Sequence, residues 1–423
     1  MRLFKWAVVR NYGSYVKVSR PTGFKVIQNP VTDKSQSLAK ALHLKIKAGG
    51  PITVADYMKT CLTNPSLGYY MQKNVIGHDG DFITSPEITQ LFGEIIGVWI
   101  YHEFSKIGSP KPWQIIELGP GRGTFIKDIV QTLKTLKATS DLSIHLVEVS
   151  PQLATVQTHN LCNDVIGIGM VQQTVKGNKF YRANKINDEI PVYWYEKLEN
   201  VPKAFSVILA HEFFDALPIH KFQKVENEWR EVLINSTVVE NGTEKFDYAV
   251  AEKESPIAKL LIDKNEKREH LEVSVRAGEI AREVAQRLEE FGGFSLFIDY
   301  GHDGDKTDTF RAFKKHQLMD PLNDPGTADL TADVDFSFLR SVMKDKVVVL
   351  GPVEQGEFLK RLGIEVRLQM LLKNAKGEEA QQLESCYRMI VDKQKMGSRY
   401  KCFATFPLVL QDYLKKYPVA GFS

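Results

Sequence analysis

The sequence predicts an α/β protein built on a largely parallel sheet. Short apolar segments suited to buried strands alternate along the chain with longer segments whose apolar residues recur at helical spacing. A glycine-rich turn joins the first of these strands to the helix that follows it. The strands predicted for this sheet are 115–118, 143–149, 206–210, 294–299, 347–350 and 402–408.

An insert of roughly 80 residues separates the third and fourth of these strands, which is too long for a simple connection. Segments 222–234 and 246–250 are typical of antiparallel strands and 276–291 of a helix, so we expect an α+β subdomain that faces the substrate. The chain is then divided into a leader (1–32), an N-terminal helical region with a lid loop (33–112), the first part of the sheet (113–218), the inserted subdomain (219–292), and the second part of the sheet with C-terminal helices (293–423).

Residues 1–32 are basic and contain no acid, whereas the whole chain has a formal net charge of only +3. Hydrophobic residues are interspersed among the basic ones, a composition typical of a mitochondrial transit peptide. A basic tail without a targeting role is the alternative. The overall charge is too small to indicate a dedicated nucleic-acid-binding protein, and no apolar run is long enough to predict a membrane span.

Two helix starts are predicted in the N-terminal region. Thr53-Val54-Ala55-Asp56 has the pattern of a capping box. Ser85, followed by Pro86, is expected to cap a long helix whose apolar residues keep helical spacing as far as Trp99. The loop before this helix carries Asp81. The loop and helix start are suited to form a lid over a cofactor, with Asp81 and Ser85 among its ligands, although an ordinary solvated loop is an equal alternative.

The turn after the first strand is suited to a nucleoside cofactor. Gly119, Gly121 and Gly123 let the backbone turn sharply and approach a ligand closely. Their GxGxG spacing differs from the GxGxxG that dinucleotide-binding folds prefer. Glu117 precedes the glycines, and a carboxylate there suits the cationic sulfonium and amino groups of S-adenosylmethionine. We therefore expect S-adenosylmethionine as the cofactor.

Glu148 ends the next predicted strand, where an acid can accept hydrogen bonds from both hydroxyls of a ribose. NAD-dependent enzymes place an acid in the same way, so Glu148 supports a nucleoside cofactor without choosing between the two. An NAD-dependent oxidoreductase is therefore an alternative that the GxGxG spacing disfavours. A tight turn that binds no ligand is a further alternative.

The segment from His211 to Pro218 follows the third strand, and chemistry in open α/β sheets lies outside the carboxyl ends of strands. Methyl transfer depends on alignment and on electrostatic support for the nucleophile. Glu212 and Asp215 are the catalytic candidates, because carboxylates bind the planar fork of a guanidinium. His211 is a candidate proton acceptor. An equally good alternative is that Asp215 caps a following helix.

Two acidic segments are left without an assigned role. Asp299-Tyr300-Gly301-His302 ends a predicted strand and is expected near the same cleft. Residues 326–336 are dense in acids, but their spacing matches no metal-binding loop, so no metal site is predicted. An acidic wall for a basic peptide, or helix capping, suits this segment better.

Eight ordered motifs between about Pro51 and Phe406 resemble one family, the MidA-type proteins, whose mitochondrial members are protein arginine methyltransferases acting in the assembly of respiratory complex I. The motifs are PITVADYM, LTNPSLGYY, GDFITSPEITQLFGE, ELGPGRGT, HLVEVSPQL, AHEFFDALPIHKF, DYGHDG and PGTADLTADVDFS. The resemblance implies a class I, Rossmann-like S-adenosylmethionine-dependent methyltransferase fold in the mitochondrial matrix. It also implies symmetric ω-N dimethylation of an arginine on the 49-kDa iron–sulfur subunit of complex I. His211 stands where many bacterial relatives look to have Asn.

Two other functions are alternatives to this one. A non-catalytic assembly chaperone with the same fold is disfavoured by the intact glycines, Glu148 and the carboxylates of the 211–218 loop. A small-molecule or nucleic-acid methyltransferase is disfavoured because the 211–218 loop lacks an Asn-Pro-Pro-Tyr type sequence and no basic stripe is present. The expected partner is thus a protein substrate and not a nucleic acid, and a homodimer is left open.

Overall fold

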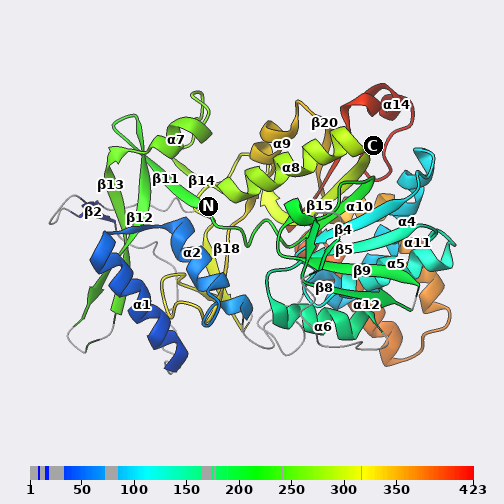
Figure 1. Ribbon diagram of the computed structural model, residues 1–423, viewed down its shortest axis with the longest axis horizontal. Coiled ribbons are helices and arrows are strands. Elements are labelled where there is room, and N and C mark those ends of the chain that lie inside the picture. The colour runs from blue at the N-terminus through cyan, green and yellow to red at the C-terminus, as the bar shows by residue number, and fades with distance from the viewer. Residues whose placement is uncertain are drawn as a thin grey trace.

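The structure, a computed structural model, describes residues 33–71, 84–162, 178–187, 189–239, 242, 244–315 and 317–423, together with short strands at 8–9, 15–18 and 173–175. These residues form two lobes that lie side by side (Figure 1). One lobe is built on a nine-stranded sheet and the other on a seven-stranded sheet. Most of the predicted leader, 1–32, lies outside the described residues, and so does Asp81.

The larger sheet contains all six predicted strands, so the α/β prediction is confirmed. Its strands are β4 (Trp113–Leu118), β5 (Leu142–Val147), β8 (Arg182–Ile186), β9 (Ile190–Tyr195), β10 (Ser206–His211), β15 (Gly293–His302), β19 (Val334–Asp335), β20 (Val347–Glu354) and β21 (Tyr400–Pro407). Their order is β20-β21-β15-β10-β4-β5-β9-β8, with β19 beside the end of β15. The five strands from β15 to β9 are mutually parallel, whereas β8 and β21 run antiparallel to their neighbours.

Helices cover both faces of this sheet (Figure 1). Ile115 packs with α4 (Gln90–Lys106) and α5 (Thr124–Thr135), whereas the next residue, Ile116, packs with α8 (Val275–Phe291) and α9 (Phe336–Met343). Such burial of successive residues is typical of a parallel sheet. The remaining helices of this lobe are α3 (Ser85–Ile88), α6 (Pro151–Leu161), η2 (Leu198–Asn200), α10 (Gln355–Arg361), α11 (Ile364–Leu372), α12 (Glu378–Val391), α13 (Met396–Arg399), η3 (Leu408–Leu410) and α14 (Gln411–Lys416). Across the described ranges, no helix is both long and apolar enough to cross a membrane.

The winding of the chain reverses at the centre of the large sheet. From β4 the chain runs outward through β5 to β9, then returns to β10 on the other side of β4 and continues to β15. Ligands of open α/β sheets bind outside the carboxyl ends of the strands at such a reversal. The two segments at this place are the glycine turn after Leu118 and the loop after His211.

The second lobe is assembled from segments far apart in the sequence. Its strands are β1 (Val8–Val9), β2 (Tyr15–Val18), β3 (Ile52–Thr53), β11 (His220–Val225), β12 (Glu228–Val238), β13 (Glu244–Glu254) and β14 (His270–Val273). Its helices are α1 (Asp33–Gly49), α2 (Val54–Thr63), η1 (Tyr69–Met71) and α7 (Pro256–Leu261). A small sheet of β16 (Arg311–Lys314), β17 (Gln317–Met319) and β18 (Asp329–Thr331) shares a core with α1 and α2, so the segment after β15 also enters this lobe.

Three local features differ from the sequence-based expectations. The helix predicted from Ser85 is two helices, because Thr89 is extended (φ −160°) and its hydroxyl caps α4 at the amide of Leu91. Thr84, not Ser85, is the N-cap of α3. Helix α8, which was expected within the inserted subdomain, packs against the large sheet. The predicted cap at Thr53 is present, since its hydroxyl accepts from the amide of Asp56 at 3.0 Å.

Candidate active site

The glycine turn after β4 has a backbone that favours glycine. The φ angles of Gly119, Gly121 and Gly123 are 64°, 53° and 81°, in the left-handed region. A Cβ on Gly119 would lie 2.7 Å from the ring of Phe213, so the loop after β10 packs directly on this turn. Helix α5 begins at Thr124, and its free backbone amides are available beside the turn.

Glu117 is buried in β4 directly before the turn. Only 2% of the residue is exposed, and burial raises the pKa of its carboxyl to about 8. Among the described residues, no group donates a hydrogen bond to its Oε2. A buried carboxylate without a partner is costly, so a cationic ligand group would stabilise it. Glu117 therefore fits the sulfonium or amino group of S-adenosylmethionine.

Glu148 lies just after β5 and is connected to the glycine turn through Gln157. Its Oε1 accepts from the amide of Ser150 at 2.7 Å, and its Oε2 accepts from Gln157 Nε2 at 3.0 Å. The same amide nitrogen donates to the carbonyl of Gly121 at 2.8 Å, and Trp194 Nε1 donates to the amide oxygen at 2.8 Å. The carboxylate keeps lone pairs for the two ribose hydroxyls. Burial raises the pKa of Glu148 to about 7.

Helix α3 contacts both halves of the site. Thr124 Oγ1 at the start of α5 donates to Glu87 Oε1 at 2.6 Å. Ser85 is fully buried, and its backbone amide donates to the carboxylate of Glu212. The structure thus brings Ser85 to the loop after β10, whereas it was expected at the cofactor. The role predicted for Asp81 falls on a residue outside the described ranges.

His211 is packed among aromatic rings at the end of β10. Its ring centroid lies 5.1 Å from that of Phe92 and 5.5 Å from that of Phe125. Burial lowers its pKa to about 3, so the imidazole is neutral and a weak base at neutral pH. This environment does not favour the role of proton acceptor that the sequence suggested, and it explains His211 as part of the core.

Glu212 is held in an unusual backbone conformation. Its φ is 49°, rare for a residue other than glycine, and its amide donates to the carbonyl of Ile298 at 3.0 Å. Burial, together with the nearby charge of Asp215, raises the pKa of its carboxyl to about 8, although a hydrogen bond from Tyr400 opposes this shift. Its Oε1 has no hydrogen-bond partner within the described part of the chain. Strain of this kind is frequent at functional sites.

Asp215 is the second carboxylate of the loop. The Tyr300 hydroxyl donates to its Oδ2, whereas its Oδ1 is buried and has no partner in the described ranges. Burial raises the pKa of Asp215 to about 6. Strand β11 follows this loop and no helix begins there, so Asp215 is not a helix cap. Neighbouring residues thus orient the carboxylates of Glu212 and Asp215. Each carboxylate still has one oxygen without a hydrogen-bond partner among the described residues.

Asp299, which had no assigned role, fixes the loop after β10. Its Oδ2 accepts from the backbone amides of Phe213, Phe214 and Asp215 at 3.1, 3.0 and 3.4 Å. Its Oδ1 accepts from the amide of Tyr300 at 3.0 Å. Asp299 therefore fixes the backbone of the loop that carries Glu212 and Asp215.

Replacing Asp299 with Ala is expected to lower the free energy of unfolding by about 3 kcal/mol or more, because two buried backbone amides and one partly buried backbone amide would lose their acceptor. Asp299→Asn keeps one acceptor oxygen and should cost less. Denaturant titration of the three proteins measures the difference. An Asp299→Ala protein as stable as the parent would contradict this role.

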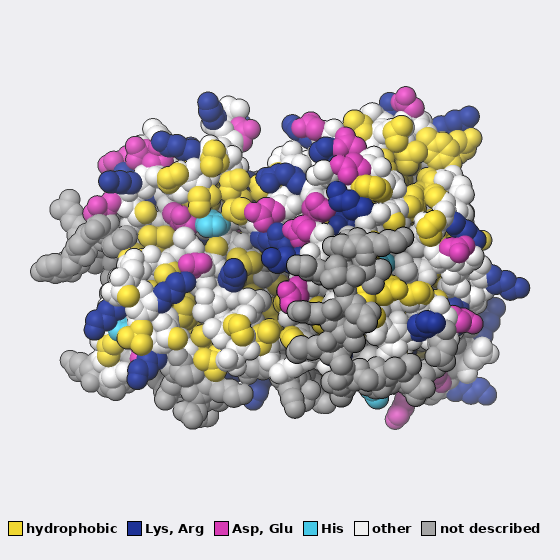
Figure 2. Space-filling model, in the orientation of Figure 1, with side chains coloured by type: hydrophobic (Ala, Val, Ile, Leu, Met, Phe, Trp, Pro, Cys, Tyr) yellow, Lys and Arg dark blue, Asp and Glu magenta, His cyan; other side chains and the backbone are white. Residues whose placement is uncertain are grey.

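The second lobe adds two side chains to the site. Tyr70 in η1 donates to Asp329 Oδ1 in β18 at 2.7 Å. Asp329 is buried, and its charge contributes to the raised pKa of Glu212. Just after β18, the amide of Ala332 donates to the carbonyl of Asp215 at 3.0 Å. The site therefore lies at the junction of the lobes, where Figure 2 shows acidic and basic side chains mixed on the visible face.

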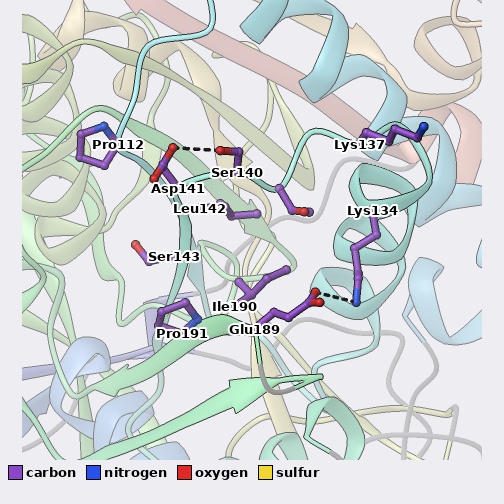
Figure 3. Close-up of a pocket in the computed structure, with 11 residues that line it drawn as sticks. Pro112, Lys134, Lys137, Ser140, Asp141, Leu142, Ser143, Glu189, Ile190 and Pro191 are labelled. Carbon is purple, nitrogen blue, oxygen red and sulfur yellow. Dashed lines mark hydrogen bonds and ion pairs between the residues drawn. The ribbon is translucent and has the colours of Figure 1, made fainter.

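A separate open pocket of about 780 Å³ lies at the opposite edge of the large sheet, where β5 and β9 begin (Figure 3). Its lining includes Lys134, which pairs with Glu189 at 3.4 Å, and Ser140, which donates to Asp141 at 2.9 Å. These charges are already paired. The pocket contains none of the site residues described above, and we assign it no part in the chemistry. Over the described residues, no three His, Cys, Asp or Glu side chains gather so as to hold a metal.

The order of the strands, the glycine turn and the two acids beside it define the class of protein, an S-adenosylmethionine-dependent methyltransferase. Residues 95–353 match the family described as "Putative S-adenosyl-L-methionine-dependent methyltransferase". The expectation of S-adenosylmethionine as cofactor is confirmed, and the alternative of an NAD-dependent oxidoreductase is rejected.

Curated relatives narrow the class to a family. The chain is 47% identical to the zebrafish (Danio rerio) "Protein arginine methyltransferase NDUFAF7, mitochondrial" over 92% of this chain and 93% of the relative. It is 44% identical to the homologue from Drosophila melanogaster (98% of both chains) and 45% identical to the human protein (91% and 86%). The chain belongs to this NDUFAF7 family, and the resemblance seen in its motifs is confirmed.

Solved structures agree with the fold. A Burkholderia thailandensis protein "bound to S-adenosyl-homocysteine" matches with a TM-score of 0.72 and 23% identity, covering 90% of this chain and 95% of that one. A second structure from the same organism matches with a TM-score of 0.68 and 22% identity over the same shares. At this identity the similarity concerns the fold, and it confirms the predicted class I methyltransferase architecture.

Proposed function

We propose that this protein is a mitochondrial protein arginine methyltransferase that forms symmetric ω-N dimethylarginine on the 49-kDa iron–sulfur subunit of complex I in the matrix. The names of its relatives support an arginine substrate and a mitochondrial location. The observation that carries the proposal is the pair Glu212 and Asp215, two buried carboxylates that each have an unpartnered oxygen within the described residues. A guanidinium, which is a planar cation with five N–H donors, suits such acceptors.

The site has a cofactor side, formed after β4 and β5, and an acceptor side, formed by the loop after β10. Glu117, the three glycines and Glu148 hold the cofactor, which supplies the methyl group when bound. Glu212 and Asp215 bind and orient the guanidinium, so that one nitrogen faces the methyl and its positive charge is balanced. Gly119 and Phe213 are in close contact, so the cofactor turn and the acceptor loop adjoin. Methylation of a guanidinium nitrogen releases S-adenosylhomocysteine and one proton. This proton passes to the carboxylate of Glu212, whose pKa is raised to about 8, and not to His211, whose pKa is lowered to about 3.

The test is transfer of an isotope-labelled methyl group from S-adenosylmethionine to the recombinant 49-kDa subunit. Fragmentation mass spectrometry should find dimethylarginine with the methyl groups on different nitrogens. If calorimetry shows cofactor binding but no arginine is methylated in this subunit, the non-catalytic chaperone gains support. Methylation of another residue type would contradict the proposed acceptor.

Arginine methylation should rise with pH over the range in which the acceptor carboxylates ionise. The raised pKa values, about 8 for Glu212 and about 6 for Asp215, mean that the carboxyl groups stay neutral until the pH exceeds these values. Because the ionised form binds the guanidinium, kcat/KM for a peptide should increase about tenfold per pH unit below the higher pKa. Glu212→Gln should remove this pH-dependent rise. A flat profile between pH 6 and 8 in the parent protein would contradict the assignment.

A further inference from the structure

We infer that the second lobe supplies half of the acceptor site, through Asp329 and Thr331 of β18. This inference rests on the proposed arginine acceptor and extends it to residues outside the methyltransferase lobe. Side chains two residues apart in a strand lie on the same face, so Asp329 and Thr331 share one face of β18. Thr331 is fully buried, and no hydrogen-bond partner for its Oγ1 is found among the described residues.

The face of β18 lies close to the acceptor loop. The amide of Ala332, the next residue, donates to the carbonyl of Asp215 at 3.0 Å. Asp329 interacts electrostatically with Glu212 and with Tyr300, and Asp215 interacts in the same way with Tyr70, the hydroxyl partner of Asp329. Glu212, Asp215 and Asp329 therefore belong to one buried cluster that draws on both lobes.

A cation would stabilise the ionised form of this cluster, because burial disfavours its negative charge. Its carboxylates are Glu212, Asp215, Asp299 and Asp329, and the positive charge of Arg311 acts on Asp215. Arg311 stacks on the ring of Tyr300 at 5.1 Å, but its guanidinium is paired with Asp333 at 2.7 Å and so offsets only part of the negative charge. A second guanidinium, from a substrate, would offset part of the negative charge that remains.

The geometry of a guanidinium also requires more than one carboxylate. Its five N–H groups point in three directions, and a single carboxylate accepts two of them at most. A buried guanidinium with donors left over would be costly. The oxygens of Asp215, Asp329 and Thr331 offer the further acceptors, and the hydroxyl of Tyr70 fixes Asp329 in place. Binding of the arginine would thus engage both lobes at once.

The test uses the full chain loaded with S-adenosylhomocysteine and two short peptides, one with a single arginine and one with citrulline, which has the same shape but no charge. Calorimetry should show that the parent protein prefers the arginine peptide. Asp329→Asn should weaken arginine binding by about tenfold or more and Thr331→Val by about threefold or more, with unchanged affinity for S-adenosylhomocysteine. Glu252→Gln, on the exposed part of β13 in the same lobe, should change neither affinity.

The binding results distinguish a failure of the second-lobe site from a failure of the proposed arginine acceptor. If the parent prefers arginine and Asp329→Asn binds it equally well, the second lobe is not part of the acceptor site. If the parent does not distinguish arginine from citrulline, the arginine acceptor itself is wrong and this inference fails with it. Should Asp329→Asn not fold, Tyr70→Phe retains the carboxylate but removes the hydrogen bond that Asp329 accepts from Tyr70. We then expect a few-fold loss of arginine affinity, and an unchanged affinity would overturn the inference.

Discussion

Gly121→Val should reduce the affinity for S-adenosylmethionine by about a hundredfold or more while the protein remains folded. Valine is branched at Cβ and disfavours the φ of 53° found at this position. Its side chain would also enter the space through which the backbone approaches the cofactor. The carbonyl of Gly121 accepts from Gln157, so a shift of this backbone would disturb Glu148 as well. Isothermal titration with S-adenosylmethionine measures the loss.

The matched control is Gly363→Val. Gly363 has a φ of 81° at the start of α11, and a Cβ there would meet nothing within 4 Å. This variant therefore introduces similar backbone strain in the same lobe without adding atoms near the glycine turn. It should lower the melting temperature and leave cofactor affinity unchanged. Full affinity in a folded Gly121→Val protein would show that the turn does not hold the cofactor.

The parallel sheet and the cofactor side of the site could be predicted from sequence because both depend on local patterns. Buried strands such as β4 are short and apolar, and the helix after Gly123 keeps its apolar spacing. Glu117 and Glu148 stand beside the ends of their strands, so the topology alone brings them together. The edge strand β8 and its neighbour β9 are not predicted, since alternating burial with polar residues in β8 resembles a surface loop.

The acceptor side could be predicted only in part, because it depends on contacts between distant segments. Asp215 is 84 residues from Asp299, and Tyr70 is 259 residues from Asp329. No periodicity connects such pairs. The break at Thr89 was missed for the opposite reason, since Ile88 and Leu91 keep helical spacing across a residue that is extended. Gln157 has no sequence pattern that distinguishes it from other polar residues of a surface helix.

Glu212→Gln should bind S-adenosylmethionine as the parent does and lose methyl transfer by roughly a hundred- to a thousandfold. Glutamine has nearly the same shape, and it can keep the hydrogen bonds that Glu212 accepts from Tyr400 and from the amide of Ser85. It removes the charge that would balance a guanidinium. The substitution also leaves the backbone requirement at φ 49° nearly unchanged, so folding should not explain the loss. Single-turnover assays at saturating S-adenosylmethionine measure the rate of methyl transfer.

Two further variants show whether a loss of turnover in Glu212→Gln comes from the missing charge at the acceptor site. Glu252→Gln is the same chemical change at an exposed position in the other lobe and should leave turnover intact. Asp215→Asn should resemble Glu212→Gln, because both carboxylates are needed to satisfy the donors of one guanidinium. Unchanged turnover in Glu212→Gln would remove this residue from the mechanism. A loss in Glu212→Gln alone would place the acceptor on Glu212 and leave Asp215 as a partner of Tyr300, whose hydroxyl already occupies one of its oxygens.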